Sequence, residues 1–256
     1  MKLLVCIKQV PDMESKFKVG AEGLWYDRHD LAWLMNEYDE YGVEQAVQLK
    51  EQTGADLTVL SIGPEQVKET IKKALAMGCD RGVHIVDDQA HLKDPFEIAS
   101  MIAEFAGDKG FDLIFTGMQS QDRGSAQVGV MVAELLTIAA VTTVVDFAFV
   151  DGQVTVKREL EGGVKAKVAS KLPVLITCQL GLNAPRYPTL PNIMKAKKKE
   201  MLSLPATDLR KAAALQETMK IEFPAKRSGG LFLEGEVASI ADRLIRILKE
   251  KTTVLA

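Results

Sequence analysis

Short apolar segments that alternate with helical segments constrain the fold of this chain more than any other feature of its sequence. Four such segments are Lys2–Ile7, Asp56–Ile62, Arg81–Val86 and Asp112–Thr116. Each is almost continuously apolar, which is typical of strands buried on both faces rather than of strands with one wet face. A stretch with apolar residues at helical spacing follows each of them. The alternation therefore predicts an α/β domain built on a parallel sheet.

The helical stretches have recognisable ends. They are Asp39–Thr53, Glu65–Met77, Pro95 to about Ala106, and Gln127–Leu136. Asp39 is a natural N-cap for the first stretch, Asp94 for the third, and Gly78 is a suitable C-cap for the second. Right-handed crossovers would place these helices on both faces of a Rossmann-like sheet. In such sheets, ligands bind beyond the carboxyl ends of the strands.

A different pattern follows these strands. Val141–Val150 and Gln153–Leu160 flank Asp151-Gly152, a strong signal for a two-residue hairpin. Val164–Ser170 and Val174–Cys178 form a second extended pair. We expect these segments to be antiparallel strands that extend the parallel sheet.

Three parts are predicted along the chain. Residues 1–180 form the α/β domain, residues 181–230 form an arm with little regular structure, and residues 231–256 carry an amphipathic helix, Glu234–Leu248. The middle part is rich in Pro, Lys and polar residues. Long irregular stretches of this kind are usually functional or bound to a partner.

Composition excludes several classes of function. The chain has 32 basic and 35 acidic residues, so no general surface for nucleic acid is expected. Its three cysteines lack the spacing of metal sites, and they fit reduced thiols in a cytoplasmic protein. The apolar run Leu3–Ile7 stops at Lys8, which indicates a buried strand and not an export signal. No segment has the length of apolar sequence needed for direct membrane insertion.

The loop after the fourth predicted strand, Gly117–Gly129, is the first candidate site. It holds small and polar residues just before a helix, whose exposed N–H groups and dipole suit a phosphate. Ser125 and Gln127 could donate hydrogen bonds, and Arg123 could supply positive charge. An ordinary strand-to-helix turn explains the same residues equally well.

Three further features could join that loop. The strand ends at Cys6–Lys8 and Ser61–Pro64 would lie beside it if the first, second and fourth strands are neighbours, although plain strand ends are the simpler interpretation. Asn36–Asp39 could contact a nucleotide, although helix capping explains it as well. His84 lies on a predicted buried strand and is interpreted as structural. No catalytic arrangement of side chains is visible in the sequence.

The segment Leu182–Lys199, with the sequence LNAPRYPTLPNIMKAKKK, is the second candidate site. Its three prolines restrict the backbone, so its apolar residues would lose little entropy on docking to a partner. Lys195, Lys197, Lys198 and Lys199 would steer an acidic partner. A solvated charge run, packed on its own domain, is the alternative.

This segment closely resembles the recognition loop of the beta subunit of electron transfer flavoproteins, which reads approximately LNEPRYATLPNIMKAKKK. The chain departs from that pattern at Ala184 and Pro188 only. Three more segments match the family in the same order along the chain: Asn36–Glu51, Glu69–Ile85 and Val156–Gly163. The resemblance covers nearly the whole chain.

The resemblance implies one half of an alpha–beta heterodimer with an adenine-nucleotide-binding fold. The alpha subunit would carry most contacts to FAD, and this chain would shield one side of the flavin and hold a structural AMP. The pair would accept electrons from acyl-CoA dehydrogenases and pass them to a quinone-linked oxidoreductase, as a carrier rather than a catalyst. Residues 181–230 would form the recognition loop and an arm around the alpha subunit.

The resemblance also implies site residues. Leu190 would anchor in a hydrophobic pocket of the dehydrogenase. The residues matched to partner binding are Leu190, Pro191, Ile193, Met194 and Lys195. The residues matched to nucleotide binding are Cys6, Asn36, Glu37, Tyr38, Asp39, Ile62, Asp122, Arg123, Gly124, Ser125, Ala126, Gln127, Val128, Gly129, Val130, Met131, Val132 and Ala133. Met13 replaces a tyrosine that many members place near the flavin.

Two other functions stay open. AMP-binding members tend to read DDDCNQTGQ, and flavin-bifurcating members, which hold a second FAD that oxidises NADH, tend to read DGDTAQVGP. This chain reads DRGSAQVGV over Asp122–Val130, which leans toward the second pattern. AMP is preferred because the recognition loop follows the AMP-binding type. A stand-alone nucleotide sensor of the universal-stress type would need only the Rossmann-like half, and the long arm argues against it.

Overall fold

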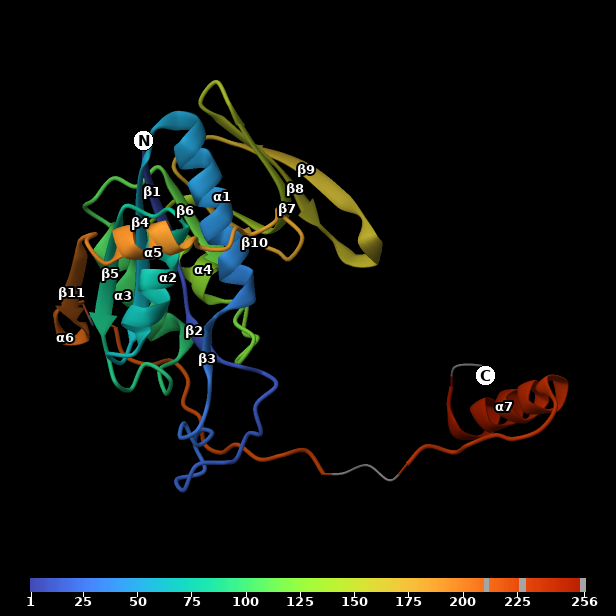
Figure 1. Ribbon diagram of the computed structural model, residues 1–256. Helices are drawn as coiled ribbons and strands as arrows, with labels where there is room; N and C mark the ends of the chain where they lie inside the picture. Colours follow the sequence, from blue (N-terminus) through green and yellow to red (C-terminus); the bar gives the residue numbers. More distant parts are fainter. Residues whose placement is uncertain (210–211, 226–228, 254–256) are drawn as a thin grey trace. The chain divides into compact units, whose positions relative to one another are not determined.

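The computed structural model describes residues 1–209, 212–225 and 229–253 (Figure 1). The chain divides into two compact units, Met1–Ile221 and Glu222–Ala256. The first unit contains the sheet and its covering helices. The second contains one described helix, α7 (Val237–Lys251).

A nine-stranded sheet forms the centre of the first unit, in the order β11-β5-β4-β1-β6-β10-β7-β8-β9. The β7–β8 and β8–β9 pairs are antiparallel, and the other pairs in this sheet are parallel. Its strands are β1 (Lys2–Cys6), β4 (Asp56–Gly63), β5 (Arg81–Val86), β6 (Leu113–Gly117), β7 (Ala139–Val150), β8 (Gln153–Glu159), β9 (Lys165–Ser170), β10 (Val174–Cys178) and β11 (Met201–Pro205).

Helices cover both faces of the sheet, and the core is split accordingly into two clusters. Leu3 and Val5 of β1 belong to the cluster that includes residues of α1 and α2, while Leu4 belongs to the cluster that includes residues of α3 and α4. Successive side chains of a strand point to opposite faces, so a strand covered on both sides must be apolar at every position. The helices of this unit are α1 (Glu37–Thr53), α2 (Val67–Met77), α3 (Pro95–Ala106), α4 (Val128–Leu135), α5 (Leu190–Ala196), α6 (Ala206–Leu209) and the short 3-10 turn Glu161–Gly163.

Most predicted elements are confirmed within a few residues, and so is the predicted α/β fold with an antiparallel extension. Gly78 ends α2, and Asp94 caps α3 by accepting the N–H of Glu97 at 2.8 Å. The hairpin at Asp151-Gly152 joins β7 to β8. Both turn residues have positive φ, 50° and 77°, as the twist of a two-residue hairpin requires.

The expected pairing of Val164–Ser170 with Val174–Cys178 is wrong. The segment Val174–Cys178 is β10, which lies between β6 and β7 and runs parallel to both. All of its residues are buried, whereas β9 alternates between exposed and half-buried positions. A continuously buried strand belongs in the middle of a covered sheet, and an alternating strand belongs at its edge.

The expectation of little regular structure over residues 181–230 is also wrong in part. Helix α5, strand β11 and helix α6 all lie in this range. Strand β11 pairs in parallel with β5 and forms the opposite edge of the sheet from β9. The sequence MLSLP alone is too short to distinguish an edge strand from a loop, because its stability comes from pairing with β5.

A two-stranded ribbon stands apart from the main sheet. It consists of β2 (Gln9–Pro11) and β3 (Trp33–Met35), which are antiparallel. A long loop, residues 12–32, connects them and forms a single isolated bridge, Val19–Tyr26. Figure 1 shows this loop extending below the carboxyl ends of the central strands.

The predicted C-terminal helix is confirmed as α7, shifted a few residues toward the C-terminus. None of its residues is buried, and Val237, Leu244 and Ile245 are exposed apolar side chains. Among the described residues, no helix combines the length and apolar character required to cross a bilayer.

Candidate functional site

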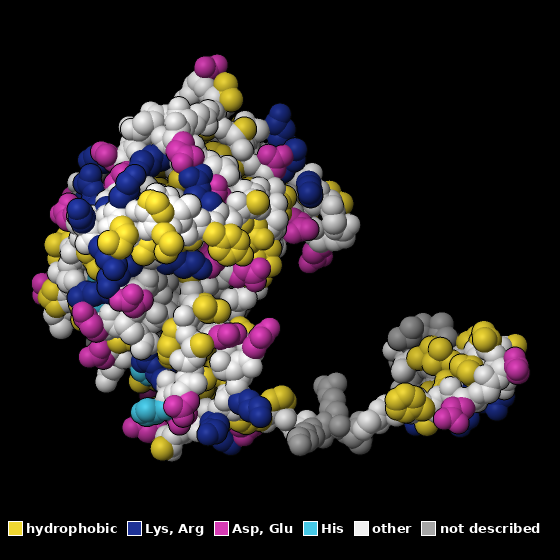
Figure 2. All heavy atoms as spheres, in the orientation of Figure 1, with side chains coloured by type: hydrophobic (Ala, Val, Ile, Leu, Met, Phe, Trp, Pro, Cys, Tyr) yellow, Lys and Arg dark blue, Asp and Glu magenta, His cyan; other side chains and the backbone are white. Residues whose placement is uncertain are grey.

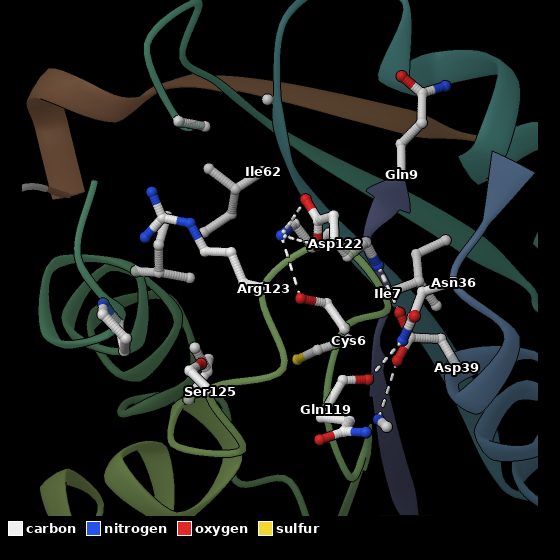
Figure 3. A pocket seen from close by; sticks show the side chains of 18 of the residues that line it. Cys6, Ile7, Gln9, Asn36, Asp39, Ile62, Gln119, Asp122, Arg123 and Ser125 are labelled. Atoms are coloured by element: carbon white, nitrogen blue, oxygen red, sulfur yellow. Dashed lines mark hydrogen bonds and ion pairs between the residues drawn. The ribbon is translucent and has the colours of Figure 1, made fainter. Parts of the chain in front are cut away.

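A cavity of about 170 Å³ opens at the carboxyl ends of β1, β4 and β6 (Figure 3). Strand β1 pairs with both β4 and β6, so the predicted neighbourhood of the first, second and fourth strands is confirmed. Figure 3 shows Arg123, Ile62 and Ser125 on one side of this cavity, and Asn36 and Asp39 on the other.

Asp39 joins the first turn of α1 to two strand ends. Its carboxylate accepts the N–H of Lys8 at 2.7 Å and the N–H of Gly117 at 3.0 Å. A Cβ at Gly117 would lie 2.2 Å from Asp39 Oδ1, so only glycine allows this approach. Burial raises the pKa of Asp39 to about 7, and the two donated N–H groups oppose that rise.

The expectation that Asp39 caps α1 is wrong. Asn36 occupies the N-cap position, and its side chain makes no cap hydrogen bond. Instead, Asn36 Nδ2 donates to the carbonyl of Gln119 at 2.8 Å, and Asn36 Oδ1 accepts the N–H of Gln121 at 3.0 Å. The side chain of Asn36 therefore fixes the loop after β6 to the start of α1.

Lys8 and Asp122 form an ion pair at the cavity wall. Lys8 Nζ lies 2.6 Å and 2.8 Å from the two carboxylate oxygens of Asp122 and 3.2 Å from Ser120 Oγ. Burial lowers the pKa of Lys8, and the charge of Asp122 opposes this. Since Lys8 neutralises Asp122, that carboxylate repels an anion in the cavity less than an unpaired one would.

The start of α4 and the residues just before it line the cavity. Ser125, Ala126, Gln127, Val128 and Gly129 all line the cavity. The first N–H groups of a helix have no intrahelical acceptor, so they can donate to an anion here. A Cβ at Gly129 would lie 2.6 Å from Thr116 Oγ1, which explains how α4 packs so close to the strand ends.

Two arginines provide the cavity with positive charge. Arg123 donates to the carbonyls of Lys93 at 2.8 Å and His91 at 2.7 Å, and its guanidinium lies 4.7 Å from the ring centre of Trp25. Arg28 lies 5.1 Å from the ring centre of Trp33. Within the described ranges 1–209, 212–225 and 229–253, neither arginine forms an ion pair with a carboxylate.

His91 lies between these arginines. Its Nδ1 is 3.2 Å from Arg28 Nη1, and burial, followed by the charge of Arg28, lowers the pKa of His91. A neutral imidazole at this position can accept a hydrogen bond from Arg28. Apolar residues also line the cavity. They include Cys6, Leu60, Ile62, Ile98 and Ile102.

The docking strip, which we define as residues 187–198, lies outside the cavity on the surface of the first unit. It contains α5, whose N-cap Thr189 accepts the N–H of Asn192 at 3.4 Å. Leu190 is 79% exposed and Met194 is 60% exposed. Figure 2 shows hydrophobic side chains gathered over α5, with Lys and Arg side chains around them.

Comparison with known proteins identifies the family. A family model described as the electron transfer flavoprotein domain matches residues 23–209. The chain is 38% identical over 260 residues, covering all of both proteins, to the "Electron transfer flavoprotein subunit beta" of Bacillus subtilis strain 168. The chain belongs to the electron transfer flavoprotein family, as a beta-type subunit.

Beta subunits from other organisms are also similar to this chain over nearly its full length. The one from Methylophilus methylotrophus is 31% identical, with 98% of each chain covered. The one from Mus musculus is 37% identical, with 91% of this chain and 93% of the relative covered. Full-length similarity to named subunits sets aside the stand-alone sensor, since the arm belongs to the matched sequence.

The cavity of this beta subunit gathers many, but not all, of the residues matched to nucleotide binding. The residues that line it are Cys6, Asn36, Asp39, Ile62, Asp122, Arg123, Ser125, Ala126, Gln127, Val128 and Gly129. The residues that do not line it are Glu37, Tyr38, Gly124, Val130, Met131, Val132 and Ala133. Val132 and Ala133 are buried in the core, and Val130 is exposed. A contiguous run of sequence cannot all face one cavity when its second half is a helix.

Sequence reasoning missed the residues of the long loop and its neighbours. Tyr26, Arg28, Trp33, Lys93 and His91 line the cavity of this beta subunit without having been predicted. The length of the loop over residues 12–32 and its basic and aromatic residues are the signal that could have pointed to it, because long loops in compact domains are usually functional.

Lys199 also differs from its predicted role. Its amine donates to the carbonyls of Leu75, at 2.9 Å, and of Cys79, at the end of α2. The ammonium group of Lys199 therefore binds carbonyls of its own subunit, while Lys195, Lys197 and Lys198 remain exposed. Among the lysines expected to steer an acidic partner, three can do so.

Proposed function

We propose that this beta subunit pairs with an alpha subunit and carries electrons between flavoenzymes. The observation that carries the proposal is the docking strip, in which apolar side chains are exposed on a proline-stiffened segment and flanked by lysines. The proposed donors are acyl-CoA dehydrogenases, and the proposed acceptor is a quinone-linked oxidoreductase. The cytoplasm is the proposed compartment, since the three cysteines are free thiols.

The test is electron transfer by the purified heterodimer. Co-expression with the alpha subunit is expected to give a yellow complex whose flavin absorbance falls when a reduced acyl-CoA dehydrogenase is added. A stable, colourless beta chain that never binds flavin together with an alpha subunit would contradict the proposal.

The alpha subunit is proposed to cover apolar side chains of the C-terminal part. Met219 is 80% exposed, Phe223 is 61% exposed and Phe232 is 87% exposed. Several large exposed apolar side chains in one short stretch are typical of a partner-binding segment. FAD would be held mainly by the alpha subunit, and this chain would shield one side, with Met13 in place of the tyrosine common in the family.

AMP is the proposed ligand of the cavity, and the residues present fit it. The apolar lining residues, which include Ile62, suit one face of a purine ring. The N–H groups at the start of α4 and the guanidinium of Arg123 suit a phosphate. Denaturing the purified heterodimer is expected to release one FAD and one AMP.

A second FAD in the cavity, as in flavin-bifurcating members, is the alternative. The segment Ala126–Gly129 follows the bifurcating pattern. The same nucleotide count decides between the two, because release of two FAD and no AMP supports bifurcation with NADH as the electron donor.

A further inference from the structure

We propose that Arg186 and Lys199 are positioning residues for electron transfer, which fasten the two ends of the docking strip to helices α1 and α2. The strip would then meet its partners already in its binding shape. This inference rests on the proposed docking function and adds the residues that hold the strip without touching the partner.

Arg186 fastens the N-terminal end of the strip to α1. Its Nε and Nη2 donate to the two carboxylate oxygens of Glu44 at 2.8 Å and 3.1 Å. Its Nη1 and Nη2 donate to the two oxygens of Glu51 at 2.6 Å and 3.0 Å. The backbone N–H of Arg186 also donates to Glu44, at 3.1 Å. One guanidinium thus makes two forked contacts with glutamates two turns apart on the same helix.

Burial distinguishes this contact from an ordinary surface ion pair. The side chain of Glu44 is only 4% exposed, and it also accepts from Gln48 Nε2 at 2.8 Å. The hydrogen bonds to Glu51 and Glu44 raise the pKa of Arg186. The hydrogen bond from Arg186 lowers the pKa of Glu51. A paired, buried carboxylate contributes more to local order than an exposed one, because leaving it unpaired is costly.

Neighbouring residues extend this end of the anchor. Asn183 Nδ2 donates to the carbonyl of Tyr41 at 3.0 Å, and Leu182 packs against the core. The segment from Leu182 to Arg186 is therefore attached along α1, and the exposed part begins at Tyr187, which is 89% exposed.

Lys199 fastens the C-terminal end to α2. Its ammonium group donates hydrogen bonds to the carbonyls of Leu75 and Cys79, where α2 ends. The last carbonyls of a helix lack intrahelical donors and carry partial negative charge, so a lysine is well placed there. Burial lowers the pKa of Lys199, which is consistent with a fixed amine rather than one free in solvent.

Between the two anchors the strip has little of its own to hold it. Helix α5 has seven residues, of which only Ala196 is buried. A helix this short is not stable alone in water. The shape of α5 therefore comes from Pro188 and Pro191, from its packing on α2 through Ala196, and from the anchors at either end.

The proposal is tested on the intact heterodimer with variants Arg186→Lys and Lys199→Met. Lysine keeps the charge of residue 186 but cannot make two forked contacts, and it avoids leaving Glu44 unpaired. Methionine keeps the unbranched stem of residue 199 without its donors. Lys197→Met is the matched control, since it removes a charge from the same strip at an exposed lysine.

Two measurements separate positioning from steering. Both anchor variants are expected to raise amide hydrogen exchange over residues 187–196 and to speed dissociation of an acyl-CoA dehydrogenase by about tenfold, as loss of one charged hydrogen bond implies. Lys197→Met is expected to slow association and weaken its salt dependence, with exchange and dissociation unchanged.

Two results would overturn the inference: anchor variants that behave like Lys197→Met, or anchor variants with wild-type exchange over the strip. Failure of the proposed function appears differently. A wild-type heterodimer that no acyl-CoA dehydrogenase reduces would refute the docking function, while the exchange measurement would still decide whether Arg186 and Lys199 hold the strip.

Discussion

The cavity and the docking strip of this beta subunit reach their shapes by opposite means. The cavity is formed where β1, β4 and β6 end, and its walls are parts of the sheet and of helices packed on it. The strip is a short exposed segment whose own residues bury almost nothing. The contrast teaches that one site is specified by the whole fold, while the other is specified by a few contacts at its ends and by the packing of α5 on α2.

The comparison predicts which changes affect both sites and which affect one. Substitutions at the start of α1 should disturb the cavity and, through α1, the strip. Substitutions within a single site should leave the other unchanged.

Asp39 should make stability depend on pH. Its folded-state pKa of about 7 lies above the ordinary 3.8, so the folded protein retains a proton that the unfolded chain releases. Stability from this group is therefore lost as pH rises from about 4 to about 7, by about 4 kcal/mol at most. Unfolding of the heterodimer across this range is compared with that of Asp39→Asn. Parallel pH profiles would show that Asp39 does not titrate in this window.

Gly117→Val should break the separation between the sites. The new Cβ would lie 2.2 Å from Asp39 Oδ1 and 2.8 Å from Tyr38 Cβ, both in α1. We expect a loss of about 3 kcal/mol of stability, loss of bound nucleotide and weaker dehydrogenase docking, since overpacking shifts the backbone. Thermal unfolding, nucleotide content and docking affinity test this. Gly229→Ala, where a Cβ meets nothing within 4 Å, is the control.

Arg123→Met should affect the cavity and leave the docking strip unchanged. Removing the guanidinium should weaken nucleotide binding by about 2 kcal/mol, as for one charged hydrogen bond, without changing docking. Nucleotide retained after gel filtration, and AMP affinity by calorimetry, are the measurements. Arg81→Met, at a half-exposed site away from the cavity, should retain nucleotide. Equal retention in both variants would exclude Arg123 from binding.

Leu190→Ala should affect the docking strip and leave the cavity unchanged. Losing a well-packed anchor should cost about 2 kcal/mol or more in docking, while bound flavin and nucleotide stay unchanged. The rate of flavin reduction at limiting dehydrogenase concentration measures the effect. Val150→Ala, at an exposed apolar position of the β7–β8 hairpin, is the control. Wild-type coupling in Leu190→Ala would refute the anchor role.

The sequence was sufficient for features that depend on local pattern. Strands buried on both faces must be apolar throughout, so β1, β4, β5 and β6 could be predicted within a residue or two. The hairpin at Asp151-Gly152 was predictable because few residue pairs adopt two positive φ angles. The strand-end position of the cavity followed from the parallel sheet.

Features that depend on distant partners could not be predicted in this way. The sequence of Val174–Cys178 does not indicate that its neighbours in the sheet are β6 and β7. Asp39 is a residue type that often caps helices. Its actual role is decided by the backbone N–H groups of Lys8 and Gly117, which the fold places beside its carboxylate. Arg28 joins the cavity only because the loop over residues 12–32 folds back onto it, and His91 reaches it from the loop between β5 and α3.

Helix α1 has contacts with both sites. Asn36 and Asp39 line the cavity at its start, and Glu44 and Glu51 hold Arg186 farther along. Its 17 residues span about 26 Å, so a tilt of about 2° would displace its far end by roughly 1 Å. A change in the tilt of α1 at one site therefore displaces residues at the other site. Mutations that improve one site are constrained by their effect on the other. Adaptation of this subunit to a new electron donor would have to proceed through residues of the strip itself, or preserve the angle of α1.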